Sequence, residues 1–447
     1  MKRVAYITFG CRLNQYDTET VRTLLENDGG YQTVAAGDGA EVFVVNTCSV
    51  TARADATARK TIRRIHRQHP EAQIVVTGCY AQRAPQELAA LDGVSVVVGA
   101  KNRAEIVELV SSPKSARPRV AVSPVNEAVK FLEVPITEMM ERSRAYVKVQ
   151  EGCNESCTFC IVPQTRGRSR SRARDRVLDQ VRGLVQRGYV EVVLTGVHVG
   201  DYGLDLAGGR RMLADLIREI LEVPGLERFR LSSIEPASVS DEIIDLMAAQ
   251  PKFARHFHIP FQSGSNAILS RMKRRYSAEY FADLIENITG RVPGCGIGSD
   301  VICGFPGETE ADFQATFDRL VDLPITYLHA FTYSVRPGSE AEAFGDRVPA
   351  EVKKRRVHSL KRLARDKNRA FREKHVGEML QVLFEGAAAG NGDRISGFSD
   401  NYLKVEAEGA ASSRVEAVRI TDLSEDCLKG ERLGRHASAQ SDPDFDS

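Results

Sequence analysis

EGCNESCTFCIVP, residues 151–163, places Cys153, Cys157 and Cys160 within eight residues. No further cysteine or histidine follows at ligand spacing, so this loop offers one thiolate fewer than a closed tetrahedral site needs. Three thiolates on a 4Fe–4S cluster leave one iron free to bind a substrate or cofactor. A zinc ribbon would need a second Cys-x-x-Cys pair, and a redox pair of Cys157 and Cys160 would not account for Cys153. The spacing therefore favours a cluster with an open iron.

The cysteine loop follows the first of six β-strand candidates between residues 142 and 345. These candidates are AYVKVQEG (145–152), EVVLTGVH (191–198), RFRLSSI (228–234), HFHIPFQSG (256–264), GIGSDVICGF (296–305) and YLHAFTYS (327–334). Helical stretches such as RMLADLIREILE and AEYFADLIENITG separate them. Six strand–helix units are too few for a closed eight-fold barrel, and they predict an open, partial one. In such barrels the chemistry lies at the carboxyl ends of the strands.

Residues 1 to about 120 alternate short β-branched runs with helical stretches, which is typical of a parallel sheet with crossover helices. Three of the predicted strands end in a cysteine, at Cys11, Cys48 and Cys79. One such cysteine is more often a small buried residue than a ligand. Because the carboxyl ends of parallel strands share one edge of the sheet, three in the same position favour a shared ligand. Again there are three thiolates and no obvious fourth.

Two further segments follow the predicted barrel. The stretch 353–374, KKRRVHSLKRLARDKNRAFREK, carries eleven Lys or Arg against two acids, an excess that favours a polyanionic partner over a merely solvated helix face. Residues from about 375 to 435 read as short strands with Gly and Asn turns and predict a small β-barrel-like module. The end, HASAQSDPDFDS (436–447), has the composition of a disordered tail.

Length and composition set the broad class of the protein. The chain has 447 residues, enough for two or three domains, with 42% apolar and 27% charged residues and a net charge of +1. No apolar run reaches the roughly 18 residues that a membrane span needs, and the first residues read as a strand rather than a signal peptide. We therefore expect a cytoplasmic protein whose nine cysteines are reduced and available for metal or redox chemistry.

CNESCTFC has the Cys-x3-Cys-x2-Cys spacing of the radical S-adenosylmethionine (SAM) superfamily, and residues 1 to about 435 resemble the radical SAM methylthiotransferases. The resemblance implies an α/β protein with three domains. They are a Rossmann-like parallel-sheet domain with an auxiliary iron–sulfur cluster (1–120), a partial (β/α)6 radical SAM barrel with the basic helix (138–374), and an all-β, RNA-binding TRAM domain (375–435).

The family has branches that act on isopentenyladenosine in tRNA, on threonylcarbamoyladenosine in tRNA, and on an aspartate of a ribosomal protein. The stretches most similar to the threonylcarbamoyladenosine branch are GCRLNQYDTE (10–19), CTFCIVPQTRGRSRSR (157–172), LTGVHVGDYG (194–203) and QSGSNAILSRMKRRY (262–276). Val197-His198 replaces a glutamine–asparagine pair typical of the isopentenyl branch. Cys295 and Cys303, and the form of YSVRPGSEAE (333–342), depart from the pattern without touching a predicted cluster ligand.

The resemblance implies two 4Fe–4S clusters and SAM as cofactors. The first cluster, on Cys153, Cys157 and Cys160, would bind SAM at its open iron and cleave it to methionine and a deoxyadenosyl radical after one-electron reduction. The second, on Cys11, Cys48 and Cys79, would carry the sulfur that one SAM methylates and that is then delivered to the base. The residues that the resemblance assigns to the SAM pocket are Thr195, Gly196, Ser233, Glu235, Gln262, Gly304 and Phe305.

We therefore expect a transferase that methylthiolates C2 of threonylcarbamoyladenosine at tRNA position 37, next to the anticodon. The expected partners are the tRNA anticodon stem-loop and an electron donor such as a flavodoxin or ferredoxin, with no membrane contact and a monomeric chain. The alternatives are an isopentenyladenosine tRNA methylthiotransferase and a non-catalytic iron–sulfur protein that binds RNA.

The sequence also predicts roles for the arginines of 166–176, for Tyr402 and for three further cysteines. RGRSRSRARDR (166–176) has Arg at every second position, which favours phosphate contacts over a loop whose arginines pair with acids. Tyr402 is either a platform for base stacking or a core residue. For Cys295, Cys303 and Cys427 we expect burial as small apolar side chains.

Overall fold

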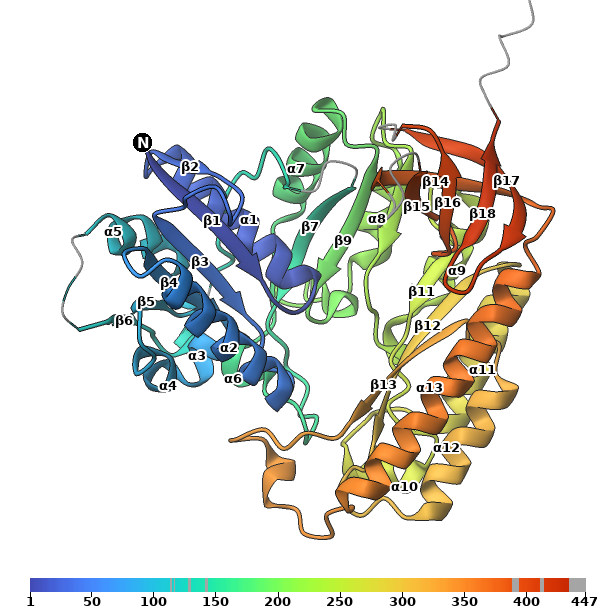
Figure 1. The fold of residues 1–447 in the computed structure, drawn as a ribbon. Helices are drawn as coiled ribbons and strands as arrows, with labels where there is room; N and C mark the ends of the chain where they lie inside the picture. Colours follow the sequence, from blue (N-terminus) through green and yellow to red (C-terminus); the bar gives the residue numbers. More distant parts are fainter. Residues whose placement is uncertain are drawn as a thin grey trace, which may run out of the picture.

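A computed structural model of the chain describes residues 1–112, 115, 117–127, 130–140, 144–387, 394–410 and 414–433. An N-terminal sheet (blue in Figure 1) lies beside a central partial barrel (green to yellow), and a small C-terminal barrel (red) packs on the central barrel away from the sheet. No helix in these ranges combines the length and the apolar character that crossing a membrane requires. The predicted tail, 436–447, lies outside the described residues.

The N-terminal sheet is parallel, with strand order β2-β1-β3-β4-β5-β6. Its strands are β1 (Lys2–Thr8), β2 (Tyr31–Thr33), β3 (Val42–Thr47), β4 (Gln73–Gly78), β5 (Val94–Val98) and β6 (Arg119–Ala121). The helices and turns are α1 (Arg12–Asn27), α2 (Ala52–Gln68), α3 (Cys79–Arg83), α4 (Pro85–Ala89), η1 (Lys101–Glu105), α5 (Ile106–Ser111) and η2 (Val125–Glu127). Because side chains alternate along a strand, Val75 packs under α1 and α5 while Ile74 and Val76 pack under α2.

The central barrel contains every strand that the sequence predicted there. They run parallel in the order β7 (Arg144–Glu151), β9 (Glu191–Gly196), β10 (Arg228–Leu231), β11 (His256–His258), β12 (Gly296–Cys303) and β13 (Tyr327–Thr332), with β8 (Arg170–Ser171) antiparallel at the β7 edge. Single bridges between Phe229 and Phe253 and between Ser233 and His258 connect β10 to β11. The wall is therefore continuous from β7 to β13, which matches the predicted partial barrel.

Helices and short turns connect the strands of this wall. They are α6 (Val162–Arg166), α7 (Arg174–Gln186), η3 (Val199–Asp201), α8 (Leu213–Leu221), η4 (Pro236–Ser238), α9 (Asp241–Ala249), α10 (Asn266–Arg271), α11 (Ala278–Arg291), α12 (Glu310–Asp322) and η5 (Glu340–Ala343). The predicted basic helix is α13 (Ala350–Glu373), which runs along the barrel toward the C-terminal module (Figure 1). On α13, buried Arg356 pairs with Glu308 at 2.6 Å and buried Leu360 joins the core, so one face of the helix is anchored.

The C-terminal module is a closed barrel, as the strand pattern predicted. Its strands follow the order β14-β15-β16-β18-β17 and are β14 (Met379–Ala387), β15 (Arg394–Ser399), β16 (Lys404–Glu408), β17 (Val415–Leu423) and β18 (Leu428–Arg432). It docks on the central barrel through Arg228 and Arg230, which donate to the backbone carbonyls of residues 381, 398, 399 and 400 at 2.8–3.0 Å. Both arginines are buried and also pair with Glu191.

Candidate active site

The loop after β7 holds Cys153, Cys157 and Cys160 close together. Gly152 starts the loop at φ +76°, and a Cβ there would lie 2.0 Å from the carbonyl oxygen of Arg168, so only glycine fits. The Sγ atoms of Cys153 and Cys160 accept from backbone N–H groups two residues later, at 3.4 Å. These hydrogen bonds restrict the rotation of the Cys153 and Cys160 side chains and fix the positions of their thiols.

Cys157 has a cationic neighbour from another part of the barrel. Arg274, just after α10, donates to Cys157 Sγ at 3.3 Å and also pairs with Glu235, which follows β10. Burial raises the pKa of Cys157, and the guanidinium partly offsets this. Glu235, one of the residues expected near SAM, is therefore connected to the cysteine loop through Arg274.

The second set of cysteines lies at the carboxyl ends of three adjacent strands, β1, β3 and β4. A Cβ on Gly10 would stand 2.8 Å from Cys48 Cβ, so the chain beside Cys11 passes directly over Cys48. Burial raises the pKa of Cys48 to about 12, with further contributions from the Cys79 and Cys11 thiols. The convergence expected from the strand ends is thus present.

The donor chemistry of both sets fits an iron–sulfur cluster. Burial also raises the pKa of Cys153 to about 12 and that of Cys160 to about 11, so these thiols ionise at neutral pH only beside a strong local positive charge such as a metal. One shared ion requires ligand atoms that all lie within 4.8 Å of one another. Among the described residues, the Sγ atoms of neither cysteine set meet this requirement. A multi-iron cluster suits this wider spacing.

A buried ion-pair network joins the two parts of the molecule between the cysteine sets. Asp17 of α1 and Glu151 of β7 each pair with Arg103, Lys148 and Arg166 at 2.7–3.2 Å, and all five side chains are at most 6% exposed. Burial alone would raise the pKa of both carboxyls, but the cations hold it below the usual value for Asp17 and well below it for Glu151. This network fixes the N-terminal sheet against the barrel mouth.

A cavity of about 220 Å³ lies beside the cysteine loop that follows β7. Val50 and Thr51, just after Cys48, line one side, and Cys160 lines the other. Gln262 and Asp300 from the barrel wall complete part of the lining. The cavity is therefore bordered by Cys160 of one cysteine set and by the two residues that follow Cys48 of the other.

The remaining residues expected near SAM fall into two groups. Thr195 and Gly196 end β9 and pair with Lys148 and Gln150 of β7, beside the cysteine loop. Ser233 is exposed after β10, and Gln262 adopts φ +62° with a buried Oε1 that has no hydrogen-bond partner among the described atoms. Residues with a Cβ rarely adopt a left-handed backbone conformation. The few that do are often found at functional sites.

Gly304 and Phe305 form the second group, away from the surface of this cavity. The Phe305 ring is fully buried and packs edge-on against Tyr333 and Phe344, in a cluster that lies behind the cysteine loop. Gly304 stands against the Lys353 side chain, which a Cβ would meet at 2.3 Å. Of Gly304 and Phe305, therefore, only the backbone atoms are free to contact a cofactor.

The expectation of phosphate contacts along 166–176 is wrong for most of its arginines. Arg166 belongs to the buried network, Arg172 pairs with Glu133 at 2.8 Å, and Arg174 pairs with Glu219. Arg170 is buried and donates to the backbone carbonyls of Arg166 and Arg168. The sequence could not show this because the acidic partners come from distant segments.

The other single-residue expectations have clear outcomes. The Tyr402 ring stacks on His256 with centroids 4.4 Å apart, and the Tyr402 hydroxyl accepts a hydrogen bond from Arg12 at 2.9 Å. Of the two alternatives for Tyr402, packing within the protein is therefore the one that the structure shows. Cys295, Cys303 and Cys427 are buried at 1–4% exposure, as expected. His198, which marks the branch in the sequence, lies with Asp201 beside Glu155 of the cysteine loop.

Sequence reasoning missed several residues of this site. They are Asp17, Arg103, Lys148, Arg274 and Asp300. One signal was available for Asp300: a titratable side chain inside the otherwise apolar strand stretch GIGSDVICGF. No local pattern marked the first four.

Comparisons with known proteins agree with this architecture. Residues 3–99 match an uncharacterized protein family, UPF0004, and residues 147–320 match the radical SAM superfamily. The chain is 39% identical to the threonylcarbamoyladenosine tRNA methylthiotransferase MtaB of Bacillus subtilis, over 95% of this chain and 94% of the relative. It is 33% identical to the tRNA-2-methylthio-N(6)-dimethylallyladenosine synthase of Moorella thermoacetica, over 97% of this chain and 98% of that one.

A solved structure shares the fold. It is the radical S-adenosylmethionine methyltransferase TsrM of Kitasatospora setae, determined with cobalamin and a [4Fe–4S] cluster, with a TM-score of 0.57 and 18% identity over 81% of this chain and 91% of that one. Clusters and SAM are the cofactors of this superfamily, and the thiol sets described above suit them. The chain belongs to the radical SAM methylthiotransferases, on the branch of the threonylcarbamoyladenosine tRNA enzymes.

Proposed function

We propose that this enzyme methylthiolates C2 of threonylcarbamoyladenosine at tRNA position 37, next to the anticodon. The observation that carries the proposal is the cavity lined by Cys160 of one cysteine set and by Val50 and Thr51, which follow Cys48 of the other. A reaction that joins a sulfur-bearing group to a radical-activated position needs these two functions within reach of one base. A cavity of about 220 Å³ admits a base that has left its stack, as enzymes acting on bases require.

In this proposal Cys153, Cys157 and Cys160 hold the cluster that binds SAM, and the other thiol set holds the auxiliary cluster. When bound, these groups supply a one-electron reductant and radical source, a sulfur, and, from a second SAM, a methyl group. The chain itself orients the loop through Arg274 and excludes water from the thiols by burial. Unpartnered Gln262 Oε1 is available to a bound molecule in the cavity.

We propose that tRNA contacts α13 and the C-terminal barrel, which we assign as a TRAM domain. The exposed face of α13 presents Lys361, Arg362 and Arg365, which have no acidic partner among the described residues. Free cations on one face suit the phosphates of an anticodon stem-loop. By contrast, Lys354, Arg355 and Arg369 are paired with acids.

We also propose the domain boundaries, the oligomeric state and the electron donor of the enzyme. We assign 1–120 to the methylthiotransferase domain, 138–374 to the radical SAM barrel and 375–435 to the TRAM domain, an assignment supported by the separate sets of strands β1–β6, β7–β13 and β14–β18. We further propose a monomer in the cytoplasm that takes electrons from a flavodoxin or ferredoxin.

A deletion strain tests the function directly. Nucleosides from its total tRNA should lack 2-methylthio-threonylcarbamoyladenosine and retain the unmodified threonylcarbamoyl form. Wild-type enzyme and the control Cys427→Ala, a buried cysteine of the C-terminal barrel, should restore the product, whereas Cys157→Ala should not. Loss of the methylthiolated isopentenyl nucleoside instead would assign the enzyme to the other tRNA branch. Unchanged nucleosides would favour a non-catalytic iron–sulfur protein.

A further inference from the structure

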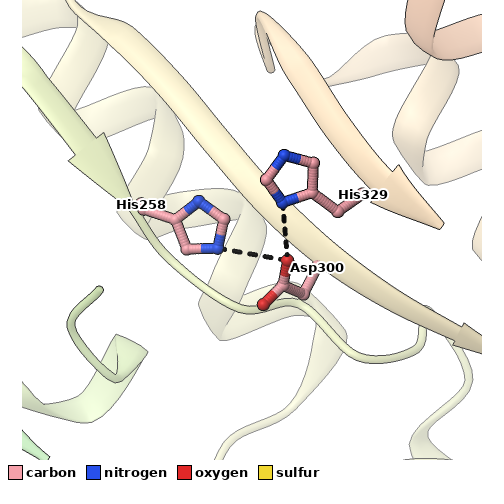
Figure 2. A group of neighbouring side chains, drawn as sticks. All are labelled: His258, Asp300 and His329. Carbon is pink, nitrogen blue, oxygen red and sulfur yellow. Dashed lines mark hydrogen bonds and ion pairs between the residues drawn. The ribbon is translucent and has the colours of Figure 1, made fainter. Parts of the chain in front are cut away.

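Three titratable side chains on neighbouring barrel strands meet in one cluster, which Figure 2 shows. His258 ends β11, Asp300 lies in β12, and His329 lies directly opposite Asp300 in β13. Asp300 Oδ1 is 3.2 Å from His258 Nε2 and 3.2 Å from His329 Nδ1. The carboxylate is therefore held between two imidazole rings.

This cluster borders the cavity that Cys160 and the two residues after Cys48 line. Asp300 lines the cavity together with Cys160. Phe331 lines it too, and it follows His329 by two residues on β13. Because side chains two residues apart share one face of a strand, His329 faces the same side, and its ring centroid is 6.3 Å from that of Phe331.

Part of the cluster's hydrogen-bonding capacity is unused. His258 is fully engaged, since its Nδ1 lies 3.3 Å from the Tyr327 hydroxyl while Nε2 faces Asp300. His329 Nε2 and Asp300 Oδ2 have no hydrogen-bond partner among the residues that the structure describes. These two side chains are 54% and 31% exposed, so a ligand can reach them.

We propose that Asp300 and His329 recognise the polar group on N6 of the substrate adenosine, with His258 as a positioning residue that holds Asp300. This proposal rests on the proposed function and deepens it. A threonylcarbamoyl group offers N–H donors of the urea type, which suit Asp300 Oδ2. Its threonine hydroxyl can donate or accept, so it suits His329 Nε2 in either protonation state of the ring.

The same geometry disfavours an isopentenyl group. That group is purely hydrocarbon, and its insertion would cover Asp300 and His329 without replacing their hydrogen bonds to water. A site built to hydrogen-bond its ligand discriminates strongly against an analogue that lacks the polar groups. The cluster therefore provides a physical reason for selection between the two tRNA branches.

A divalent ion is the other occupant that two histidines and a carboxylate attract. It would have to bind the inner atoms, Asp300 Oδ1, His258 Nε2 and His329 Nδ1, and Oδ1 already pairs with both nitrogens. The free atoms are instead the outer ones, which favours a ligand arriving from the cavity.

Binding measurements with the reconstituted full-length enzyme test the subsite. The probes are three anticodon stem-loops of identical sequence, carrying threonylcarbamoyladenosine, isopentenyladenosine or unmodified adenosine at position 37. Wild-type enzyme should bind the first loop more tightly than the other two. His329→Ala and Asp300→Asn should each reduce that preference about 10-fold, the scale of one hydrogen bond to a charged group.

His358→Ala is the matched control. His358 is exposed on α13, and any contact it makes with the RNA backbone affects the three loops alike, so its preference should equal that of wild type. Iron content per chain verifies that each variant is folded and loaded.

Two results would overturn the subsite. One is an unchanged preference in both cluster variants at wild-type iron content. The other is about one equivalent of a bound divalent metal in wild-type enzyme that Asp300→Asn loses. If wild-type enzyme fails to methylthiolate the threonylcarbamoyl loop at all, the proposed function itself fails and the subsite falls with it. Normal turnover of that loop with an unchanged preference in the variants rejects the subsite alone.

Discussion

Arg166 holds two carboxylates that belong to different parts of the fold, Asp17 at 2.9 Å and Glu151 at 3.0 Å. Its burial is almost complete, so its removal takes from both acids one of the three cations that hold them in a poorly solvated place, while Arg103 and Lys148 remain paired with them. Losing a hydrogen bond to a charged group typically costs about 1.5–3 kcal/mol. The arginine is thus expected to stabilise the contact between sheet and barrel rather than bind RNA.

Arg166→Met should therefore lower the free energy of unfolding of the apo protein by about 1.5–3 kcal/mol, the scale of a hydrogen bond to a charged group. Arg168→Met is the control, because Arg168 lies two residues further along and is exposed. Urea denaturation measures both variants. Equal stability of the two variants would show that the network is not a structural link.

The two cysteine sets should have separable roles, because SAM is expected only at the loop after β7. Wild-type enzyme should hold about eight irons per chain, and either triple Cys→Ala variant about four, given two 4Fe–4S clusters. Cys48→Ala should abolish methylthiolation and keep deoxyadenosine formation, whereas Cys157→Ala should abolish both. Iron analysis and product chromatography provide the readouts. Equal loss of deoxyadenosine in the two single variants would refute the division of roles.

Strand ends and local spacing made it possible to predict from the sequence which cysteines gather in each set, because both signals lie within a few residues. The same reasoning found every long strand of the sheet and barrel. It missed β2 and β6, which are three residues each and too short for any periodicity to show. It also misread Arg166 and Arg172, whose acidic partners, such as Asp17 and Glu133, become neighbours only through tertiary packing.

Strand β10 connects the central barrel to the C-terminal barrel through its charged residues. Arg228 and Arg230 point their guanidinium groups at backbone carbonyls of the C-terminal barrel, and Glu191 of β9 lies behind them. Burial favours the neutral form of Glu191, but Arg230, Arg228 and Arg144 lower its pKa to about 2. A truncation after about residue 375 would expose this buried cluster, so point variants are the better probe of the C-terminal barrel.

The depressed pKa of Glu191 predicts an acid-sensitive contact between the two barrels. An unfolded glutamate has a pKa near 4.5, so this group stabilises the fold above that pH and loses its contribution as the pH falls toward about 2. The full contribution corresponds to about 3 kcal/mol.

Glu191→Gln should be less stable than wild type at pH 7, and the difference should shrink between about pH 4.5 and 2. Urea denaturation at several pH values measures it, with the exposed Glu351→Gln of α13 as the control. A difference that does not depend on pH would contradict the ion-pair explanation.

Considered as one molecule, the protein carries its cysteine sets near the sheet–barrel junction, and α13 exposes cations that have no acidic partner among the described residues. Replacing Lys361, Arg362 and Arg365 by serine should weaken tRNA binding and flatten its dependence on salt, by a slope of about 0.7–0.9 per lost phosphate contact. Arg369→Ser is the control, since Arg369 is paired with Glu373. Titrations at several salt concentrations measure both variants. An unchanged slope in the triple variant would remove α13 from the RNA interface.

We propose that the enzyme methylthiolates threonylcarbamoyladenosine and that the cavity beside Cys160 holds this base. Mass spectrometry of an anticodon stem-loop carrying that nucleoside, after anaerobic incubation with reconstituted enzyme, SAM and a reductant, tests it most directly. We predict that one methylthio group is added at C2 of the modified adenosine and that a loop with isopentenyladenosine remains unchanged. An unchanged threonylcarbamoyl loop, in the presence of enzyme that holds its irons and cleaves SAM, would contradict the claim.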